Sequence, residues 1–251
     1  MEKFIFNGSV LPEREGLSIP FTTFTRMDEL TNYKFKTDLF VSSGLVTAIV
    51  EPLTVGILEP FRFKTVVEES IRAILDVHGY SQGKAFDVDI KTCVEPSGEV
   101  REYGIGVDEL MKDTSSRPVQ SSEIIRAFSK SDYLPIALGD LRESIKSGHT
   151  AFYCYRALES IRQHFYKAED GDKRCHSWER MRDNLNITKE WINARIGDYA
   201  VPSRHGSSKP MSNMEIVITI KSAWQVMDRF CFYLTHDSKS LDQNIWPVLK
   251  P

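Results

Sequence analysis

Arg204, His205 and Gly206 are consecutive residues whose types are suited to chemistry on a phosphate. Arginine presents a planar set of donors that matches phosphate oxygens. Histidine titrates near neutral pH and can act as a general acid or base. Glycine gives the backbone freedom to turn beside a ligand. Together these residues predict a phosphate-handling site, and the alternative is a solvated Arg-His pair on a surface loop.

A second group of polar residues follows helical spacing earlier in the chain. Tyr155, Glu159 and Arg162 recur every three or four residues, which places them on one stripe of a helix. The simplest interpretation of Glu159 and Arg162 is an intrahelical ion pair of small energy. The functional alternative is that both support the site at Arg204, His205 and Gly206.

Residues that bind metals form no recognisable pattern. The four cysteines are widely scattered in the sequence: Cys93, Cys154, Cys175 and Cys231. The spacing of His164, Cys175 and His176 fits no standard zinc site. We therefore expect no metal, no cofactor and reduced thiols.

The carboxy-terminal half must position these residues, and its apolar residues recur at helical spacing. Helices are expected at residues 134–146, 150–168, 177–185, 188–199 and 212–234. Ser212 and Glu215 have the form of a capping box, and residues 201–206 are expected to break the chain between the last two helices. Short connections between helices of these lengths predict an antiparallel bundle. The aromatic segment 230–233 is expected to bury one side in the bundle and to offer the other to a dimer partner.

The amino-terminal half has a different, strand-like pattern. Strands are expected at residues 4–10, 19–24, 33–41, 45–50, 86–94 and 100–107, with a turn at Asn7-Gly8. Pro20 predicts an edge strand, because proline cannot donate to a sheet ladder. Residues 61–78 have helical spacing, and Gly79 is the expected C-cap. These patterns predict an α+β domain with a largely antiparallel sheet.

The expected organisation is a β-rich α+β domain at residues 1–110, a polar linker at 111–120 and a helical domain at 121–251. Hydrophobic residues make up 41% and charged residues 27%, as in ordinary globular proteins. The net charge of -3 gives no global attraction to nucleic acid, so RNA binding would need a local basic patch. No segment is apolar and long enough to span a membrane, and no signal peptide is evident. We expect a cytoplasmic protein.

The helical half resembles a known family. The run Tyr155-Arg156-Ala157-Leu158-Glu159-Ser160-Ile161-Arg162 is similar to the first core helices of HEPN domains, the higher eukaryote and prokaryote nucleotide-binding superfamily. Arg204-His205-Gly206 before the last long helix adds to the likeness, which is strongest to the Apea-like branch. The resemblance covers residues 121–234. Some members of that branch carry a β-rich domain before the helices, whereas the amino-terminal half here has no motif of its own.

The resemblance implies a function and an assembly. Many HEPN proteins are metal-independent endoribonucleases or toxins, often in antiviral defence, and they dimerise so that two motifs line one cleft. RNA supplies its own 2′-hydroxyl nucleophile, so no metal is needed. On this basis His205 is the expected acid or base, Arg204 or Arg195 the phosphate ligand, and Glu159, Arg162 and Gly206 the supporting residues. RNA or a nucleotide is the expected partner, together with a second copy of the chain.

The spacing departs from the HEPN pattern, in which four to six residues separate the arginine from the histidine. Arg195 precedes His205 by nine intervening residues and Arg204 precedes it by none. Arg195 would reach the site if residues 198–203 bulged out, and Arg204 would otherwise take its place. The alternative is a non-catalytic HEPN-like module for dimerisation or for binding nucleotide, RNA or protein. A β-domain sensor fused to a helical effector is compatible with either.

Overall fold

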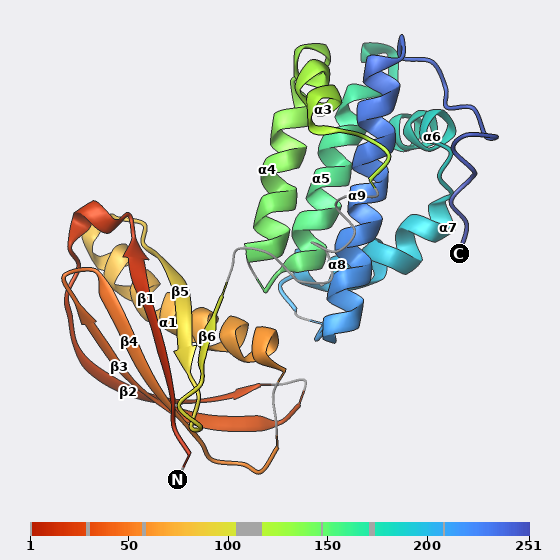
Figure 1. Ribbon diagram of the computed structural model, residues 1–251. Coiled ribbons are helices and arrows are strands. Elements are labelled where there is room, and N and C mark those ends of the chain that lie inside the picture. The colour runs from red at the N-terminus through yellow and green to blue at the C-terminus, as the bar shows by residue number, and fades with distance from the viewer. Residues whose placement is uncertain are drawn as a thin grey trace. The chain divides into compact units, whose positions relative to one another are not determined.

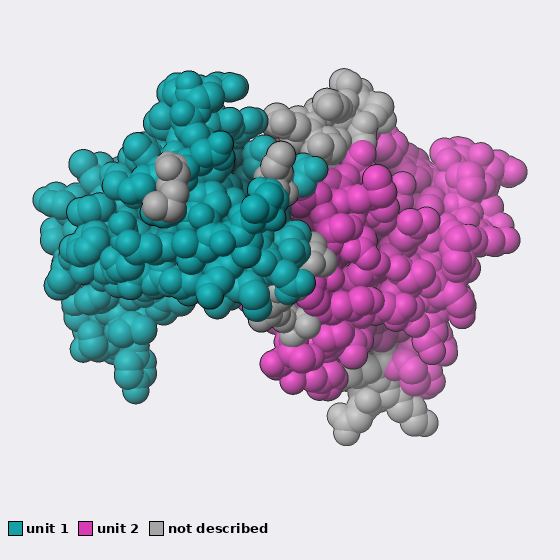
Figure 2. Space-filling view, turned by 90° about the horizontal axis from the view of Figure 1, so that it is seen from below, with its two compact units in different colours: residues 1–106 teal, residues 107–251 magenta. Residues whose placement is uncertain are grey.

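The computed structural model describes residues 2–28, 31–56, 59–103, 117–146, 148–170, 174–207 and 209–251. The chain divides into two compact units, residues 1–106 and residues 107–251 (Figure 2). Part of the expected linker, residues 111–116, lies outside the described residues. None of the helices described is both long and apolar enough to cross a bilayer.

The first unit is a six-stranded antiparallel sheet with one long helix against it (Figure 1). Its elements are β1 (Phe4–Leu11), β2 (Ile19–Asp28), β3 (Tyr33–Ser42), β4 (Leu45–Pro52), α1 (Pro60–Gln82), β5 (Asp87–Val94) and β6 (Val100–Glu102). The strand order is β2-β3-β4-β1-β5-β6, so β2 is an edge strand as Pro20 predicted. The α+β class and the antiparallel sheet expected from the sequence are confirmed.

One face of the sheet buries its side chains against α1. Phe35 and Leu39 of β3 alternate with exposed residues, and both are fully buried. From α1, Val67, Ile71 and Leu75 fall at steps of four residues and are fully buried in the same core. The buried residues recur every second position in the strands and about every fourth position in the helix. Together they form one apolar layer.

Two glycines have roles that differ from the expected ones. The turn expected at Asn7-Gly8 is instead a β-bulge inside β1, where the pairing with β5 shifts register. A Cβ atom on Gly8 would lie 2.1 Å from the carbonyl oxygen of Asp89. The expected C-cap at Gly79 is also wrong, because α1 continues to Gln82 and ends at Gly83 with φ 64°. Gly79 allows the chain to fold back, since a Cβ there would meet the Lys84 carbonyl oxygen at 2.5 Å.

We expect Gly8→Ala to lower the free energy of unfolding of the first unit by about 3 kcal/mol, because the added methyl overlaps a backbone carbonyl of the paired strand. Gly139→Ala, in α4 of the second unit, is the comparison for a glycine without close neighbours. It lies in a helix with open space around its Cβ position, so it should stabilise by about 0.5 to 1 kcal/mol. Urea denaturation followed by circular dichroism measures both. An unchanged midpoint for Gly8→Ala would contradict the role of the bulge.

The second unit consists of helices, among which α4, α5 and α9 lie side by side (Figure 1). The α-helices described are α3 (Ser121–Ala127), α4 (Tyr133–Lys146), α5 (Thr150–His164), α6 (Arg174–Leu185), α7 (Lys189–Ile192), α8 (Asp198–Arg204) and α9 (Asn213–Thr235). The expected capping box is confirmed, because the Ser212 hydroxyl accepts from the Glu215 backbone N–H at 3.3 Å. In return the Glu215 carboxylate accepts from the Ser212 N–H at 2.7 Å.

The expected break at residues 201–206 is displaced toward its carboxy-terminal end. A π-helical turn, Asn193–Gly197, follows α7 directly, and α8 follows that turn without a gap. The helical run continues through Pro202 and ends only at His205. Ile196 and Ala200 are fully buried. This burial offsets the cost of the backbone hydrogen bond that Pro202 cannot donate.

Residues 241–249 are tied to the helices by a buried asparagine and a buried arginine. Asn186 has φ 53°, and its side-chain amide donates to the carbonyls of Leu241 at 2.8 Å and Trp246 at 3.0 Å. The Arg229 guanidinium donates to the carbonyls of Leu185 at 2.8 Å and Pro247 at 2.7 Å. Burial lowers the pKa of Arg229 to about 10, so it stays charged at neutral pH.

The aromatic segment 230–233 buries one side, as expected from the sequence. Phe230 and Cys231 are fully buried, and Tyr233 is 8% exposed. Phe232 is half-buried and lies against the Trp246 ring at 5.1 Å between centroids. Most of the segment therefore packs within the unit, and its contact with a dimer partner stays a prediction.

We expect Asn186→Ala to destabilise the second unit by about 3 kcal/mol, because it removes two buried hydrogen bonds and strains the left-handed backbone. Asn186→Gly removes the same hydrogen bonds but tolerates the backbone, so its cost should be smaller by about 1 kcal/mol. Urea denaturation followed by tryptophan fluorescence suits this test, because all four tryptophans lie in the second unit. Equal costs for the two variants would contradict the strain at this position.

Candidate functional site

Arg204, His205 and Gly206 form the end of α8, and the ending has the geometry of a Schellman motif. The Ser207 N–H donates to the Pro202 carbonyl at 3.0 Å, and the Gly206 N–H donates to the Ser203 carbonyl at 3.3 Å. Gly206 has φ 78°, a conformation that favours glycine. Gly206 therefore ends the helix, and its position leaves Arg204 and His205 exposed on the last turn.

Arg204 pairs across helices with Glu159 of α5. The Arg204 Nη2 atom lies 3.3 Å from Glu159 Oε1, and the two side chains are 38% and 32% exposed. The sequence suggested an intrahelical pair of Glu159 with Arg162 and did not predict the pair of Glu159 with Arg204 of another helix. The pairing forms because α5 packs directly against α8.

Two arginines and two aromatic rings form a continuous row beside this ion pair. The Arg204 guanidinium lies 5.0 Å from the centre of the Tyr155 ring, and the Tyr155 and Trp178 ring centres are 5.8 Å apart. The Arg162 guanidinium lies 5.8 Å from the centre of the Trp178 ring. Each guanidinium over a ring face is an attractive cation–π contact. We call Arg204, Tyr155, Trp178 and Arg162 the arginine–aromatic row.

The two ends of this row differ in exposure. Arg162 is only 5% exposed, and its Nη1 atom donates to the Ser177 hydroxyl at 2.9 Å. Burial raises the pKa of Tyr155, and the Glu159 carboxylate raises it further. The Tyr155 phenol therefore remains neutral at physiological pH. Arg162 supports the row from inside the unit, whereas Arg204 meets solvent.

His205 is exposed and follows Arg204 at the helix end. Among the residues described, none forms a hydrogen bond or ion pair with the imidazole, and Asp198 does not cap it. A carboxylate cap would have indicated a purely local role for the histidine. The imidazole is instead accessible for proton transfer to or from a ligand.

Arg195 is not brought to His205. It lies in the π-helical turn, and the segment expected to bulge out, residues 198–203, is helical. Ten residues of helix separate the two α-carbons by about 15 Å along the axis. The Arg195 carbonyl accepts from the Thr219 hydroxyl at 3.0 Å, which fixes this turn against α9. Arg204 is therefore the arginine available beside His205.

Metal ligation has no geometric support in the described part of the chain. No group of three or more His, Cys, Asp or Glu side chains there could hold a metal ion. His164 is half-buried, and its Nδ1 atom lies 3.1 Å from the Ser131 hydroxyl. Burial lowers the pKa of His164 and favours its neutral form.

Sequence reasoning missed a cavity in the first unit, which carries no recognisable motif. The cavity has a volume of about 630 Å³ and is lined by aromatic rings and a few polar groups. Tyr33 and Phe63, which help to form it, had been assigned only to a strand and a helix. The sequence shows that both residues are aromatic. It does not show that their rings lie close together, because that depends on sheet register and on the packing of α1.

Comparison with known protein families assigns both units to one family. Residues 4–103 match the model of the DUF8168 N-terminal domain, and residues 122–235 match that of the DUF8168 C-terminal domain. The chain belongs to the DUF8168 family. Both DUF8168 domains are described as domains of unknown function, so the family describes the architecture without assigning a reaction. Searches of curated proteins and of solved structures gave no match.

We expect Glu159 and Arg204 to be coupled by about 0.2 to 1 kcal/mol in a double-mutant cycle, because the pair is only partly exposed. The cycle combines Glu159→Gln with Arg204→Gln, and the coupling should shrink as salt rises. The control cycle uses Glu123 and Arg126, whose atoms are 4.0 Å apart with the arginine 69% exposed, and should give almost no coupling. Equal coupling in both pairs would contradict a specific link between α5 and α8.

Proposed function

We propose that the helical unit is a HEPN-like, metal-independent endoribonuclease that acts in the cytoplasm as a homodimer, in defence or stress response. The observation that carries the proposal is the exposed Arg204-His205 pair, with Arg204 oriented by Glu159 and Tyr155 from a neighbouring helix. The resemblance of residues 121–234 to HEPN domains supports the biological role and the antiparallel bundle.

The proposed reaction needs only the RNA and two kinds of side chain. The 2′-hydroxyl oxygen attacks the adjacent phosphorus as its proton is removed, and the bond to the 5′-oxygen breaks as that oxygen gains a proton. The products are a 2′,3′-cyclic phosphate and a 5′-hydroxyl. His205 of one copy can take the first proton while His205 of the second copy supplies the other. The reaction would then need the histidines of both copies, which is why we propose a homodimer.

Arg204 would stabilise the charge that develops on the phosphate. A guanidinium has five N–H donors, and the contact with Glu159 uses only one edge of it. The remaining donors can face a phosphate oxygen. Glu159 and Tyr155 hold the side chain in place, so less conformational freedom is lost when RNA binds.

A second candidate, a non-catalytic HEPN-like module that binds RNA, nucleotide or protein, is favoured by the electrostatics of the same site. Glu159 already neutralises Arg204, which weakens attraction to a phosphate. The carboxy-terminal end of a helix also carries partial negative charge, which favours the cations there over an added anion. The atypical spacing and the distant Arg195 point the same way.

The test is cleavage of a structured RNA by the full chain in EDTA. We expect cutting that leaves 2′,3′-cyclic phosphate ends and that requires a 2′-hydroxyl at the cut position. His205→Ala should lower the rate by about 10² or more through loss of acid-base catalysis. Arg204→Ala should lower it by about 10² through loss of charge stabilisation.

His149→Ala is the matched control, because His149 is also exposed in the helical unit but lies before α5 rather than at the end of α8. It should retain full activity. Light scattering reports the oligomeric state of every variant. RNA binding without cutting by a folded dimer would establish the non-catalytic candidate, and cutting that survives His205→Ala would contradict the proposed mechanism.

A further inference from the structure

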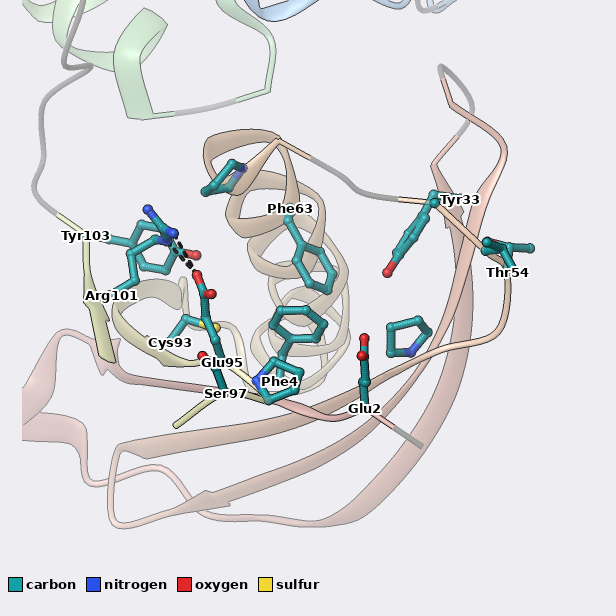
Figure 3. A pocket seen from close by; sticks show the side chains of 15 residues that line it. Glu2, Phe4, Tyr33, Thr54, Phe63, Cys93, Glu95, Ser97, Arg101 and Tyr103 are labelled. Carbon is teal, nitrogen blue, oxygen red and sulfur yellow. Dashed lines mark hydrogen bonds and ion pairs between the residues drawn. The ribbon is translucent and has the colours of Figure 1, made fainter. Parts of the chain in front are cut away.

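The cavity of the first unit lies at the amino-terminal end of α1, between the edge formed by β5 and β6 and the ends of β3 and β4 (Figure 3). Its volume of about 630 Å³ is in the range of sites that hold small organic ligands. All of the residues that line it belong to the first unit. Whatever it binds is therefore recognised apart from the Arg204-His205 pair.

Flat aromatic surfaces form the inside of the cavity. The Phe63 ring meets the Phe4 ring edge-to-face at 5.1 Å and the Tyr33 ring at 5.8 Å. Figure 3 shows the Phe4 and Phe63 rings near the amino-terminal end of α1, with Tyr33 to one side of them. The Tyr103 ring lies on the other side. Such walls favour a planar ring that can stack or pack edge-to-face.

The Tyr33 hydroxyl is a donor that points into this space. Tyr33 is only 6% exposed, and Figure 3 shows its oxygen directed into the cavity. In the described structure no protein group forms a hydrogen bond with that oxygen. Burial raises the pKa of Tyr33 and the nearby Glu2 carboxylate raises it further, so the phenol keeps its proton. The hydroxyl faces the open cavity, so a ligand acceptor there would replace water as its hydrogen-bond partner.

The Glu2 carboxylate faces the same space and offers acceptors (Figure 3). The other acid and the base of the lining satisfy each other, because Arg101 donates to the Glu95 carboxylate through Nη2 at 2.7 Å and through Nε at 2.9 Å. Among the described lining residues the charges sum to one negative, from Glu2. The cavity therefore favours a ligand with N–H donors and disfavours an anion.

We propose that this cavity binds a neutral nucleobase or nucleoside through an edge that carries N–H donors beside a carbonyl acceptor. Guanine has the best-matched edge: its N1–H and exocyclic amine can donate to the Glu2 carboxylate while its O6 accepts from the Tyr33 hydroxyl. The ring lies among Phe4, Phe63 and Tyr33. A phosphorylated form binds less well, because it adds negative charge to the ligand of a cavity whose lining already carries one net negative charge.

Isothermal titration calorimetry of the full chain with guanosine tests this assignment. We expect a dissociation constant of about 0.1 mM, and weaker binding of guanosine monophosphate. 1-Methylguanosine keeps the ring and the carbonyl but lacks the N1–H donor, so its affinity should fall about tenfold. Binding of the monophosphate more tightly than guanosine would overturn the assignment.

Two variants connect the affinity to the polar groups of the cavity. Tyr33→Phe removes only the hydroxyl and should weaken guanosine binding about fivefold, and Glu2→Gln should weaken it about tenfold. Glu99→Gln is the matched control, because Glu99 is an exposed carboxylate of the same unit that does not line the cavity, and it should leave the affinity unchanged. Circular dichroism confirms that each variant is folded.

Two results would refute the proposal. One is that guanosine at about 1 mM gives neither heat nor a saturation-transfer NMR signal with the folded chain. Binding that weak would not indicate a specific site. The other is binding that both Tyr33→Phe and Glu2→Gln leave unchanged, which would place guanosine elsewhere on the protein. Loss of affinity in both variants with retention in Glu99→Gln supports the assignment.

Discussion

The helical unit depends on α5, which is buried on one face and polar on the other. Cys154, Leu158 and Ile161 are fully buried on the inner face. Burial raises the pKa of the Cys154 thiol to about 12, so this cysteine fills the core without reactivity. The outer face carries Tyr155 and Glu159, which contact Arg204. Because one rigid helix has both faces, core packing sets the position of the arginine that meets solvent.

This dependence means that the side chains of the candidate site are positioned together by helix packing. The contacts of α5 with α8 and α9 fix the position of Arg204. Gly206 ends the helix at the residue after His205. A loop would have to order two long side chains on binding, at an entropic cost. Here the ordering is already present in the folded state. The same logic holds in the first unit, where sheet register and α1 bring Tyr33 and Phe63 together before any ligand arrives.

Local sequence rules predicted the elements that depend on local chemistry. The helical spacing of α5, the capping box of Ser212 and Glu215, and the edge position of the strand with Pro20 are all confirmed. The rules failed where distant segments decide. Gly79 is a residue type typical of helix caps, yet a glycine is needed there because the Lys84 carbonyl comes close. Pro202 is tolerated inside α8 because other residues of this helical run are buried. The Arg204–Glu159 pair and the unpaired Tyr33 hydroxyl depend on contacts between elements, which no local pattern encodes. The two proposals together describe a sensor that recognises a base and an effector that acts on a phosphate backbone.

Arg229 has a consequence for how the chain is made. One of its acceptors is the Pro247 carbonyl, twelve residues beyond the end of α9 at Thr235. During translation α9 emerges before that acceptor, so the guanidinium has only its Leu185 and Asn186 acceptors until residue 247 has left the ribosome. The first unit has no such delay, because its strands and α1 are complete by residue 103. We therefore expect the nascent sheet to fold while the helices are still being synthesised, and the helical unit to close only once residues 241–249 have emerged.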